Sequence, residues 1–341
     1  MKRLICGLLL LSFFLSGCAG QGRAEQKRYE ATFLTLFDTV TTIKGAAESQ
    51  EAFTATAQAI HDELLHYHRL FDIYNDYEGL NNLKTVNDNA GIAPVTVDRA
   101  VLDLLLDCKD YFELTDGRVN VAMGSVLYLW HRARTDSLDD PANAYLPDPA
   151  ALEEASAHVS PDAVVIDEAA STVFITDPAV RLDVGAVAKG WSAQRVSENA
   201  PKGLLISVGG NVCATGPKDE SGTPWVIGVQ NPADSSTNLH TLYISGGSVV
   251  TSGDYQRAFR VGGRLYHHII DPDTLYPSAY WRSVTIVCPD SGLADALSTA
   301  LFLLPREEGQ ALLDKTQAQA MWVDAEGTCF YSPGFEKLIR T

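Results

Sequence analysis

Two oxygen-bearing side chains stand four residues apart toward the C-terminal end of the chain. Asp295 and Thr299 lie in an apolar run that predicts a helix over Leu293–Leu304, and a spacing of four places both side chains on one face of that helix. A carboxylate and a hydroxyl are hard oxygen donors, which suit Mg²⁺ and not zinc. The threonine hydroxyl has an alternative, a bond back to the carbonyl of Asp295, which is a common arrangement for threonine in helices.

A second group of polar residues lies in Leu182–Gly190, which has the sequence LDVGAVAKG. Asp183 is at an expected strand end, and Gly185 permits a close approach of the backbone. Lys189 falls in the first turn of an expected helix, and a helix N-terminus beside an ammonium group is a natural anion site. The alternative is structural, with Asp183 as a helix cap and Lys189 as a solvated surface residue.

Histidines and aspartates gather on two segments that are expected to be loops between strands. These segments are Thr251–Tyr255 (TSGDY) and His267–Pro272 (HHIIDP). His268 should point to the opposite face from His267, and one of the two imidazoles is a candidate general base. A solvent-facing pair is the alternative. Ser207–Asn211 (SVGGN) follows an expected strand, and its glycines either make a tight turn or let backbone N–H groups reach a phosphate.

Hydrophobic periodicity predicts the elements that must position these residues. Amphipathic helices are expected over Ser49–Asp72 and, after the N-cap Asp98, up to Gly117. Arg134–Pro149 is acidic and interrupted by prolines, so it is predicted to be a solvated loop. Strands are expected at Thr39–Lys44, Val164–Ile166, Val173–Ile175, Leu204–Val208, Trp225–Gln230, Thr241–Ser245, Ala258–Val261 and Ser283–Val287, and further helices at Ala186–Glu198, Leu293–Leu304 and Arg306–Lys315. Short glycine turns between neighbouring strands favour antiparallel sheets with packed helices, an α+β fold.

The first residues of the chain are typical of a bacterial lipoprotein export signal. Lys2 and Arg3 form a basic start, and the apolar stretch Leu4–Leu15 is too short to span a bilayer, which takes roughly 20 residues. Small residues then lead to Cys18, the expected mature N-terminus after removal of residues 1–17. Lipid chains on Cys18 would anchor the protein to a membrane surface outside the cytoplasm, on the periplasmic side if there is an outer membrane. An ordinary secretory signal or an uncleaved anchor is the alternative.

The rest of the chain is expected to form one acidic domain. Residues 18–28 are small and polar, as suits a tether between lipid and fold, and residues 29–341 are long enough for a large core. The formal net charge of the whole chain is −17, which disfavours nucleic-acid binding. A phosphate ligand would need local basic groups or a metal ion to reverse this field.

In their order and spacing these segments resemble one family, the ApbE-type flavin transferases, which are FAD:protein FMN transferases. The resemblance covers nearly the whole mature chain and takes in four further segments: Phe37–Thr39, Ile73–Asn87, Gly117–Gly124 with Trp130, and Ala294–Ala300. It implies an α+β fold of antiparallel sheets with packed helices, related to the T-fold.

The resemblance also implies roles for single residues. Asp183 and Lys189 would contact FAD. The metal, Mg²⁺, would be held by the Ala186 carbonyl, Asp295 and Thr299, with Ser298 close by. The flavin pocket would be lined by Phe37, Tyr74, Ala122, Met123, Gly124 and Ile269. We nominate His268 as the base, with Asp271 or Asp254 as its possible orienting partner.

The implied reaction is attack by a threonine or serine hydroxyl of a target protein on the FMN-side phosphorus of FAD. AMP departs, FMN stays on the acceptor, and Mg²⁺ neutralises the developing charge. The expected acceptors are subunits of respiratory redox complexes. Alternatives are hydrolysis of FAD to FMN and AMP, flavin storage or delivery, and a solute-binding lipoprotein with two similar α/β lobes about a hinge.

The chain departs from the family pattern in three places. Phe37 stands where the family has methionine, and Val119 and Asn120 stand where it has Phe-Asp. Leu275 replaces the glycine of Thr-Gly-x-Pro after the DP. Leucine in a turn position that needs a positive φ would be strained, so this loop is predicted to take another path.

Overall fold

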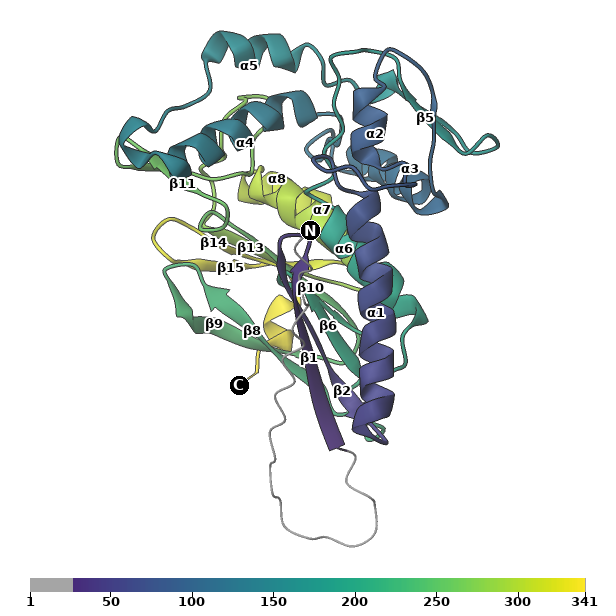
Figure 1. Cartoon of the computed structure of the whole chain (residues 1–341). Coiled ribbons are helices and arrows are strands. Elements are labelled where there is room, and N and C mark those ends of the chain that lie inside the picture. Colours follow the sequence, from purple (N-terminus) through teal and green to yellow (C-terminus); the bar gives the residue numbers. More distant parts are fainter. Residues whose placement is uncertain (1–26, 341) are drawn as a thin grey trace, which may run out of the picture.

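The computed structural model describes residues 27–340, and its largest element is an eight-stranded sheet. The strands run in the order β1-β2-β6-β7-β10-β13-β14-β15, and each neighbouring pair is antiparallel (Figure 1). The expected export signal and Cys18 lie outside the described residues. The strand bounds are β1 Lys27–Leu36, β2 Thr39–Ala47, β6 Leu204–Val208, β7 Asn211–Ala214, β10 Gly247–Gly253, β13 Ser283–Cys288, β14 Gln319–Val323 and β15 Cys329–Tyr331.

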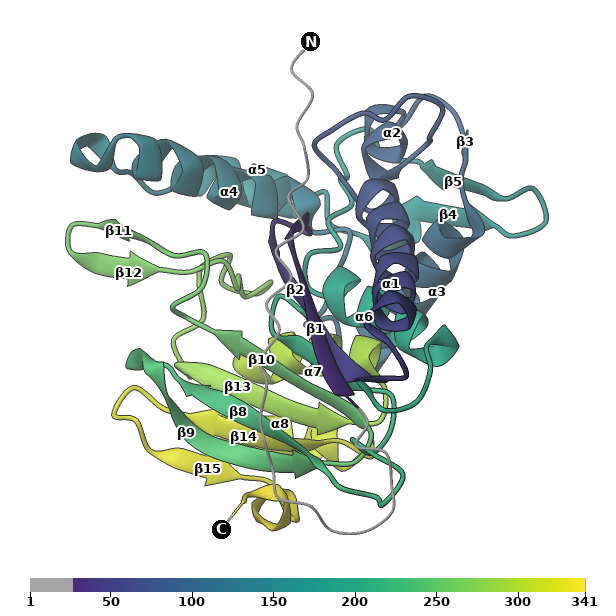
Figure 2. The same cartoon turned by 60° about the horizontal axis from the view of Figure 1, so that its bottom comes forward.

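Helices pack on one face of this sheet (Figures 1 and 2). The first, α1, begins after Ser49, whose side chain accepts a hydrogen bond from the Ala52 N–H, and it buries Phe53, Ala57, Ile60 and Leu64 at helical spacing. In α7 only Leu293 and Thr299 of the twelve residues are not buried, so this helix is a core element with one partly open position on its polar side. The helix bounds are α1 Gln50–Leu70, α6 Ala188–Asn199, α7 Ser291–Phe302 and α8 Arg306–Leu313.

A two-stranded hairpin covers the opposite face of the sheet. Trp225, Ile227 and Val229 alternate with more exposed residues along its first strand, as expected for a strand with one buried face. They share an apolar cluster with Met321 of β14 and with Phe335. The sheet is therefore the central layer of the fold. The bounds are β8 Trp225–Asn231, β9 Asp234–Ile244 and η3 Phe335–Leu338.

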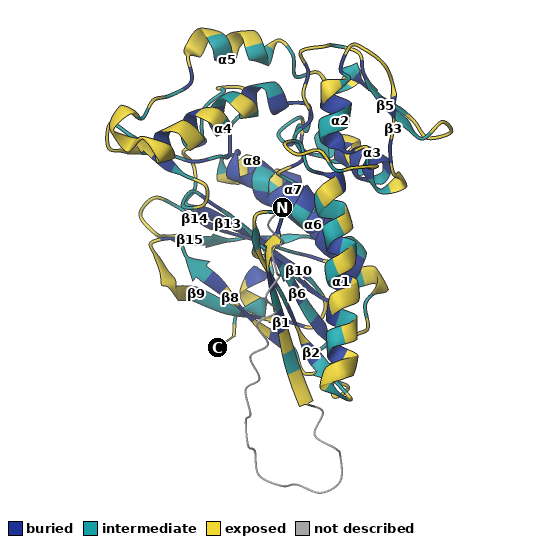
Figure 3. Ribbon diagram, in the orientation of Figure 1, coloured by how far each residue is buried: buried dark blue, intermediate teal, exposed yellow. Residues whose placement is uncertain are grey.

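Two smaller units flank one end of the sheet. One contains α2, α3 and a three-stranded sheet, and in the other α4 and α5 extend over a hairpin (Figure 2). The outward faces of α4 and α5 are exposed (Figure 3). Within residues 27–340 no helix combines the length and the apolar character needed to cross a membrane. The bounds are α2 Leu83–Asp88, β3 Val95–Thr96, α3 Arg99–Leu114, α4 Gly124–Asp139, η1 Pro141–Asn143, α5 Pro149–Ser156, η2 Pro161–Ala163, β4 Val164–Asp167, β5 Thr172–Ile175, β11 Phe259–Val261 and β12 Arg264–Tyr266.

The predicted loop at Arg134–Pro149 is wrong over its first part, because α4 continues to Asp139. The helix is amphipathic, and its buried positions include Val126, Trp130 and Ala133 at helical spacing. The exposed polar residues of its last turns, among them Thr135, Asp136 and Asp139, concealed this period in the sequence. The helical region therefore extends along one side of the site described below.

Two other expectations also need correction. Lys27 and Arg28 were expected in the tether but belong to β1, which pairs with β2 along most of its length. Thr251–Gly253 was expected in a loop but forms the end of β10, which pairs with β13. Both strands lie in the eight-stranded sheet, where hydrogen bonds to distant segments decide strand formation more than local composition does. The other predicted helices and strands are confirmed, with bounds that shift by a few residues, except that the strand expected at Thr241–Ser245 already begins at Asp234.

Candidate active site

One pocket of about 440 Å³ collects most of the predicted site residues. It lies between the tip of the β1–β2 hairpin, the segment before α6, the pocket side of α7 and the underside of α4. The predicted residues that line it are Phe37, Tyr74, Met123, Asp183, Ala186, Lys189, His268, Ile269, Asp295 and Thr299. Segments separated by more than 250 positions in the chain thus meet in one cavity.

Three of the predicted site residues lie next to this pocket but do not line it. Ala122 is fully buried. Gly124 begins α4, where a Cβ would lie 2.5 Å from the carbonyl oxygen of Arg181, so the glycine permits α4 to start against the segment that leads to Asp183. Ser298 donates to the Asp295 carbonyl at 2.8 Å and bonds the Ser252 hydroxyl at 2.7 Å. These residues support the pocket and do not line it.

Asp295 is a buried carboxylate held by several donors. Its Oδ2 accepts from the Gly190 N–H at 2.8 Å and lies 3.7 Å from Lys189 Nζ. Asn211 Nδ2 is 3.4 Å from the same oxygen. Burial raises the pKa of this carboxyl, and the charge of Lys189 opposes the rise. A Cβ at position 190 would lie 2.5 Å from the Asp295 Cβ, which is why glycine stands there.

The contact between Gly190 and Asp295 leaves the Ala186 carbonyl without its usual helical donor. In a regular helix the Gly190 N–H would donate to the carbonyl four residues earlier, which is that of Ala186. Because this N–H donates to Asp295 instead, the Ala186 carbonyl has no backbone partner among residues 27–340. A carbonyl oxygen on the pocket wall is thereby free to bind a ligand.

Thr299 lines the pocket, and its hydroxyl makes no hydrogen bond to another described residue. The alternative in which it bonds back to the Asp295 carbonyl is wrong, because the structure has no such bond; the side-chain donor to that carbonyl is the Ser298 hydroxyl. Residues 27–340 contain no group of three or more His, Cys, Asp or Glu side chains placed to hold a metal. The donor set is instead one carboxylate, one hydroxyl and one carbonyl. Such a set fits Mg²⁺, which keeps waters and binds substrate phosphates besides few protein oxygens.

His268 and His267 have different partners. His268 Nδ1 lies 3.1 Å from the carbonyl oxygen of Gln256, so Nδ1 carries the proton in that bond and Nε2 is free to accept one. Burial and the charges of Arg257 and Lys189 lower the pKa of His268 to about 3, which keeps the imidazole neutral near pH 7. His267 is buried, with Nε2 2.8 Å from the Ser278 carbonyl oxygen.

Neither predicted orienting carboxylate contacts His268, and this prediction is wrong. Asp254 accepts from Arg282 Nε at 3.0 Å, and Asp271 lies 3.5 Å from Arg118 Nη1. Both carboxylates are thus engaged by arginines. The Gln256 carbonyl orients the imidazole, and a backbone acceptor of this kind leaves no signal in the residue types.

Phe37 occupies a strained hairpin tip at the edge of the pocket. Phe37 and Asp38 have φ of 52° and 53°, a region that costs non-glycine residues about 1–2 kcal/mol each. The Phe37 N–H donates to His68 Nδ1 at 3.2 Å, and the two rings meet edge to face. His68 therefore holds the tip in place, a contact that the sequence did not predict.

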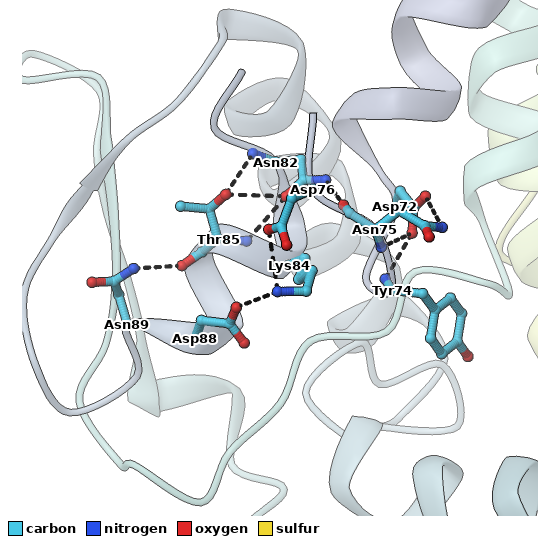
Figure 4. A network of polar contacts seen from close by, with 9 residues as sticks. All are labelled: Asp72, Tyr74, Asn75, Asp76, Asn82, Lys84, Thr85, Asp88 and Asn89. Atoms are coloured by element: carbon cyan, nitrogen blue, oxygen red, sulfur yellow. Dashed lines mark hydrogen bonds and ion pairs between the residues drawn. The ribbon is translucent and has the colours of Figure 1, made fainter. Parts of the chain in front are cut away.

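Tyr74 follows α1 on a loop that is fixed by Asp72. Asp72 Oδ1 accepts from the N–H groups of Tyr74 and Asn75 at 2.7 and 3.0 Å (Figure 4). The Tyr74 ring stacks on His131 of α4, with centroids 5.0 Å apart. A tyrosine and a histidine from separate units thus form one aromatic wall, and the sequence did not predict the contribution of His131.

The loop after Asp271 and Pro272 keeps the left-handed turn that the sequence predicted it would lose. Leu275 has φ of 62°, so the left-handed turn survives without glycine, and the expectation of another path is wrong. Trp130 Nε1 donates to the Leu275 carbonyl at 2.9 Å, and the Leu275 N–H donates to the Asp271 carbonyl at 2.8 Å. The leucine side chain packs in the cluster around Trp130. These contacts offset the cost of the left-handed backbone.

At the second departure, Asn120 supplies the oxygen that an aspartate would offer. Its Oδ1 accepts from the Ala122 N–H at 2.9 Å, and its Nδ2 donates to the Val159 carbonyl at 2.8 Å. The local turn before α4 is therefore kept.

Comparison with known proteins identifies the family and agrees with this fold. The ApbE family model matches residues 37–322, and the chain belongs to the ApbE family. It is 35% identical over 266 residues to a FAD:protein FMN transferase of Klebsiella pneumoniae strain 342, covering 74% of this chain and 79% of that one. It is also 35% identical over 249 residues to the FAD:protein FMN transferase of Treponema pallidum, covering 68% of this chain and 67% of the relative.

Solved structures share the architecture. The crystal structure of the ApbE protein from Thermotoga maritima superposes with a TM-score of 0.82 at 29% identity, covering 92% of this chain and 100% of that one. The apo form of the flavinyl transferase ApbE from Pseudomonas stutzeri gives a TM-score of 0.76 at 22% identity and covers 93% of this chain and 98% of its own. The second match shows the fold alone. The expected α+β architecture is confirmed.

Proposed function

We propose that this chain transfers the FMN part of FAD to a hydroxyl of an acceptor protein and releases AMP. The observation that carries the proposal is the pocket, which joins a free carbonyl, a buried carboxylate and an unbonded hydroxyl to an aromatic wall and a neutral histidine. The chain is similar to relatives named FAD:protein FMN transferase over two thirds or more of its length.

The reaction is a phosphoryl transfer. A threonine or serine hydroxyl of the acceptor attacks the phosphorus on the FMN side of FAD. The bond from that phosphorus to the bridging oxygen breaks, and AMP leaves with the electron pair. His268 Nε2 takes the hydroxyl proton, because Nδ1 is committed to the Gln256 carbonyl and the Nε2 lone pair is free.

The residues that would hold Mg²⁺ are Ala186 through its carbonyl, Asp295 and Thr299. When bound, the metal supplies positive charge against the phosphates. Lys189 adds an ammonium group 3.7 Å from Asp295 Oδ2, and it stands in the first turn of α6, where the helix dipole also favours anions. Together these groups reverse the field of an acidic protein at one place.

The rival functions differ in product. Hydrolysis of FAD uses the same residues, with water in place of the acceptor hydroxyl. Storage or delivery of flavin predicts FAD binding without AMP. A solute-binding lipoprotein predicts two similar α/β lobes, whereas residues 27–340 build one eight-stranded antiparallel sheet with helices and a hairpin on its faces, so the fold disfavours that function.

The proposal also covers where the protein is located and which proteins accept the FMN. Lipidation of Cys18 would place the enzyme on the extracytoplasmic face of a membrane, where it would flavinylate outward-facing subunits of respiratory redox complexes. The support for this part is the export signal in the sequence.

The deciding experiment incubates the mature protein with FAD and magnesium, with and without an acceptor domain. AMP is measured by chromatography, and flavin on the acceptor is measured by in-gel fluorescence. AMP together with a fluorescent acceptor supports the transferase. AMP at the same rate without an acceptor, and no fluorescent band with one, would support the hydrolase. Bound FAD without AMP would support storage.

A further inference from the structure

Two arginines face the pocket without an acidic partner. Arg134 of α4 and Arg257 of the β10–β11 loop both line the cavity. Neither forms an ion pair with a carboxylate of residues 27–340, while the third arginine of the pocket, Arg118, lies 2.6 Å from Asp273 Oδ2. Two guanidinium groups that share a partly enclosed cavity repel each other. Asp38, Asp72, Asp183 and Asp295 also line the cavity. None of these carboxylates forms an ion pair with Arg134 or Arg257, so both guanidiniums are open to an anionic ligand.

Arg134 is fixed in position by the aromatic wall. Its Nη2 donates to His131 Nδ1 at 3.1 Å, because a guanidinium has no acceptor. His131 in turn stacks on Tyr74. Burial and the charge of Arg257 both lower the pKa of Arg134, and no carboxylate is among the groups that act on it. This guanidinium therefore shares the cavity with Arg257, and no carboxylate of residues 27–340 forms an ion pair with it.

Arg257 lines the cavity together with this wall and the oxygen donors. Its charge opposes the rise that burial causes in the pKa of Tyr74 and of Asp295, and it adds to the fall that burial causes in the pKa of His131 and of His268. Its backbone has φ of 46°, an unfavourable conformation for a residue other than glycine. Such strain is often found where a loop must present a side chain to a ligand.

We infer that Arg134 and Arg257 form the anion site for the diphosphate of FAD, with Arg257 at the phosphate that faces Asp295 and Thr299 and Arg134 at the other phosphate. The inference rests on the proposed function and adds two residues to it. A guanidinium presents paired N–H donors that match phosphate oxygens. The negative charges of the diphosphate remove the repulsion between the two arginines. As AMP leaves with the electron pair of the broken bond, the charge that grows on its phosphate lies beside these guanidiniums.

The test is equilibrium binding of FAD and of riboflavin, which lacks phosphate, measured by flavin fluorescence with magnesium and without an acceptor. Arg134→Gln and Arg257→Gln are each expected to raise the Kd for FAD about 10- to 100-fold, the range for loss of a charge-assisted hydrogen bond. The Kd for riboflavin should change by less than about twofold, since uncharged flavin makes no such bond. The Kd of wild type for FAD should rise with salt more steeply than that of the double variant.

Matched controls are available on the same elements. Arg132→Gln removes a solvent-side charge from α4 that pairs with Asp136, and Arg260→Gln removes one from β11 that bonds Gly263. Both should bind FAD as wild type does. Variant Kd values for FAD within about twofold of wild type, or an equal loss of riboflavin affinity, would overturn the arginine site. Wild type that binds no FAD would instead overturn the proposed function.

Discussion

Thr299 is a single hydroxyl whose removal tests the oxygen site. It lines the pocket from α7 and makes no hydrogen bond to another described residue, so its loss should not disturb packing. We expect Thr299→Val to raise the magnesium concentration for half-maximal AMP release at least about tenfold, because one oxygen ligand is lost. Thr299→Ser keeps the hydroxyl and should behave as wild type. An unchanged magnesium titration in the valine variant would contradict the assignment.

His268 carries a prediction about pH. Its pKa is lowered from 6.5 in the unfolded chain to about 3 in the folded protein, so between these values the unfolded state binds the proton and the folded state does not. The stability associated with the neutral imidazole is therefore present above pH 6.5 and is lost as the pH falls toward 3. The Tm of wild type should fall more steeply on acidification than that of His268→Gln. Parallel Tm curves for the two proteins would show that the imidazole is not protected in this way.

At the scale of elements, α4 and the loop after His268 depend on each other. The Trp130 indole donates to the carbonyl of Leu275, which has a positive φ. Trp130→Phe keeps an aromatic ring but leaves that carbonyl without its donor, and we expect it to lower the free energy of unfolding by about 1–2 kcal/mol. Tyr128→Phe, on the same helix with a half-exposed ring, is the control and should change it little. Chemical denaturation measures both, and equal values would remove the proposed role of the indole.

At the scale of the whole molecule, the prediction concerns whether the protein is bound to a membrane. If lipid chains on Cys18 anchor the protein, as we propose, then removal of that cysteine should release it from the membrane. We expect Cys18→Ala to move the protein from the membrane fraction to the soluble fraction. The rate of AMP release should stay unchanged, because the pocket is built from residues 37–299. A membrane-bound alanine variant would contradict lipid anchoring.

Sequence alone determined the class of fold and most of the pocket. Helical and strand periods indicate which face of each element is apolar. The spacing of four within the helical run of α7 puts Asp295 and Thr299 on one face. The order of short motifs indicated the family before any contact was known. These signals are local or depend on residue type, so a sequence preserves them.

Tertiary structure decided which groups of the pocket contact one another. The Ala186 carbonyl is free only because the Gly190 N–H reaches Asp295, and His268 is oriented by a backbone carbonyl in place of a carboxylate. Arg134 and Arg257 meet because α4 extends over the loop after β10. Each of these contacts joins segments through backbone atoms or across long chain separations. Packing selects such pairs, and neither residue type nor spacing records them.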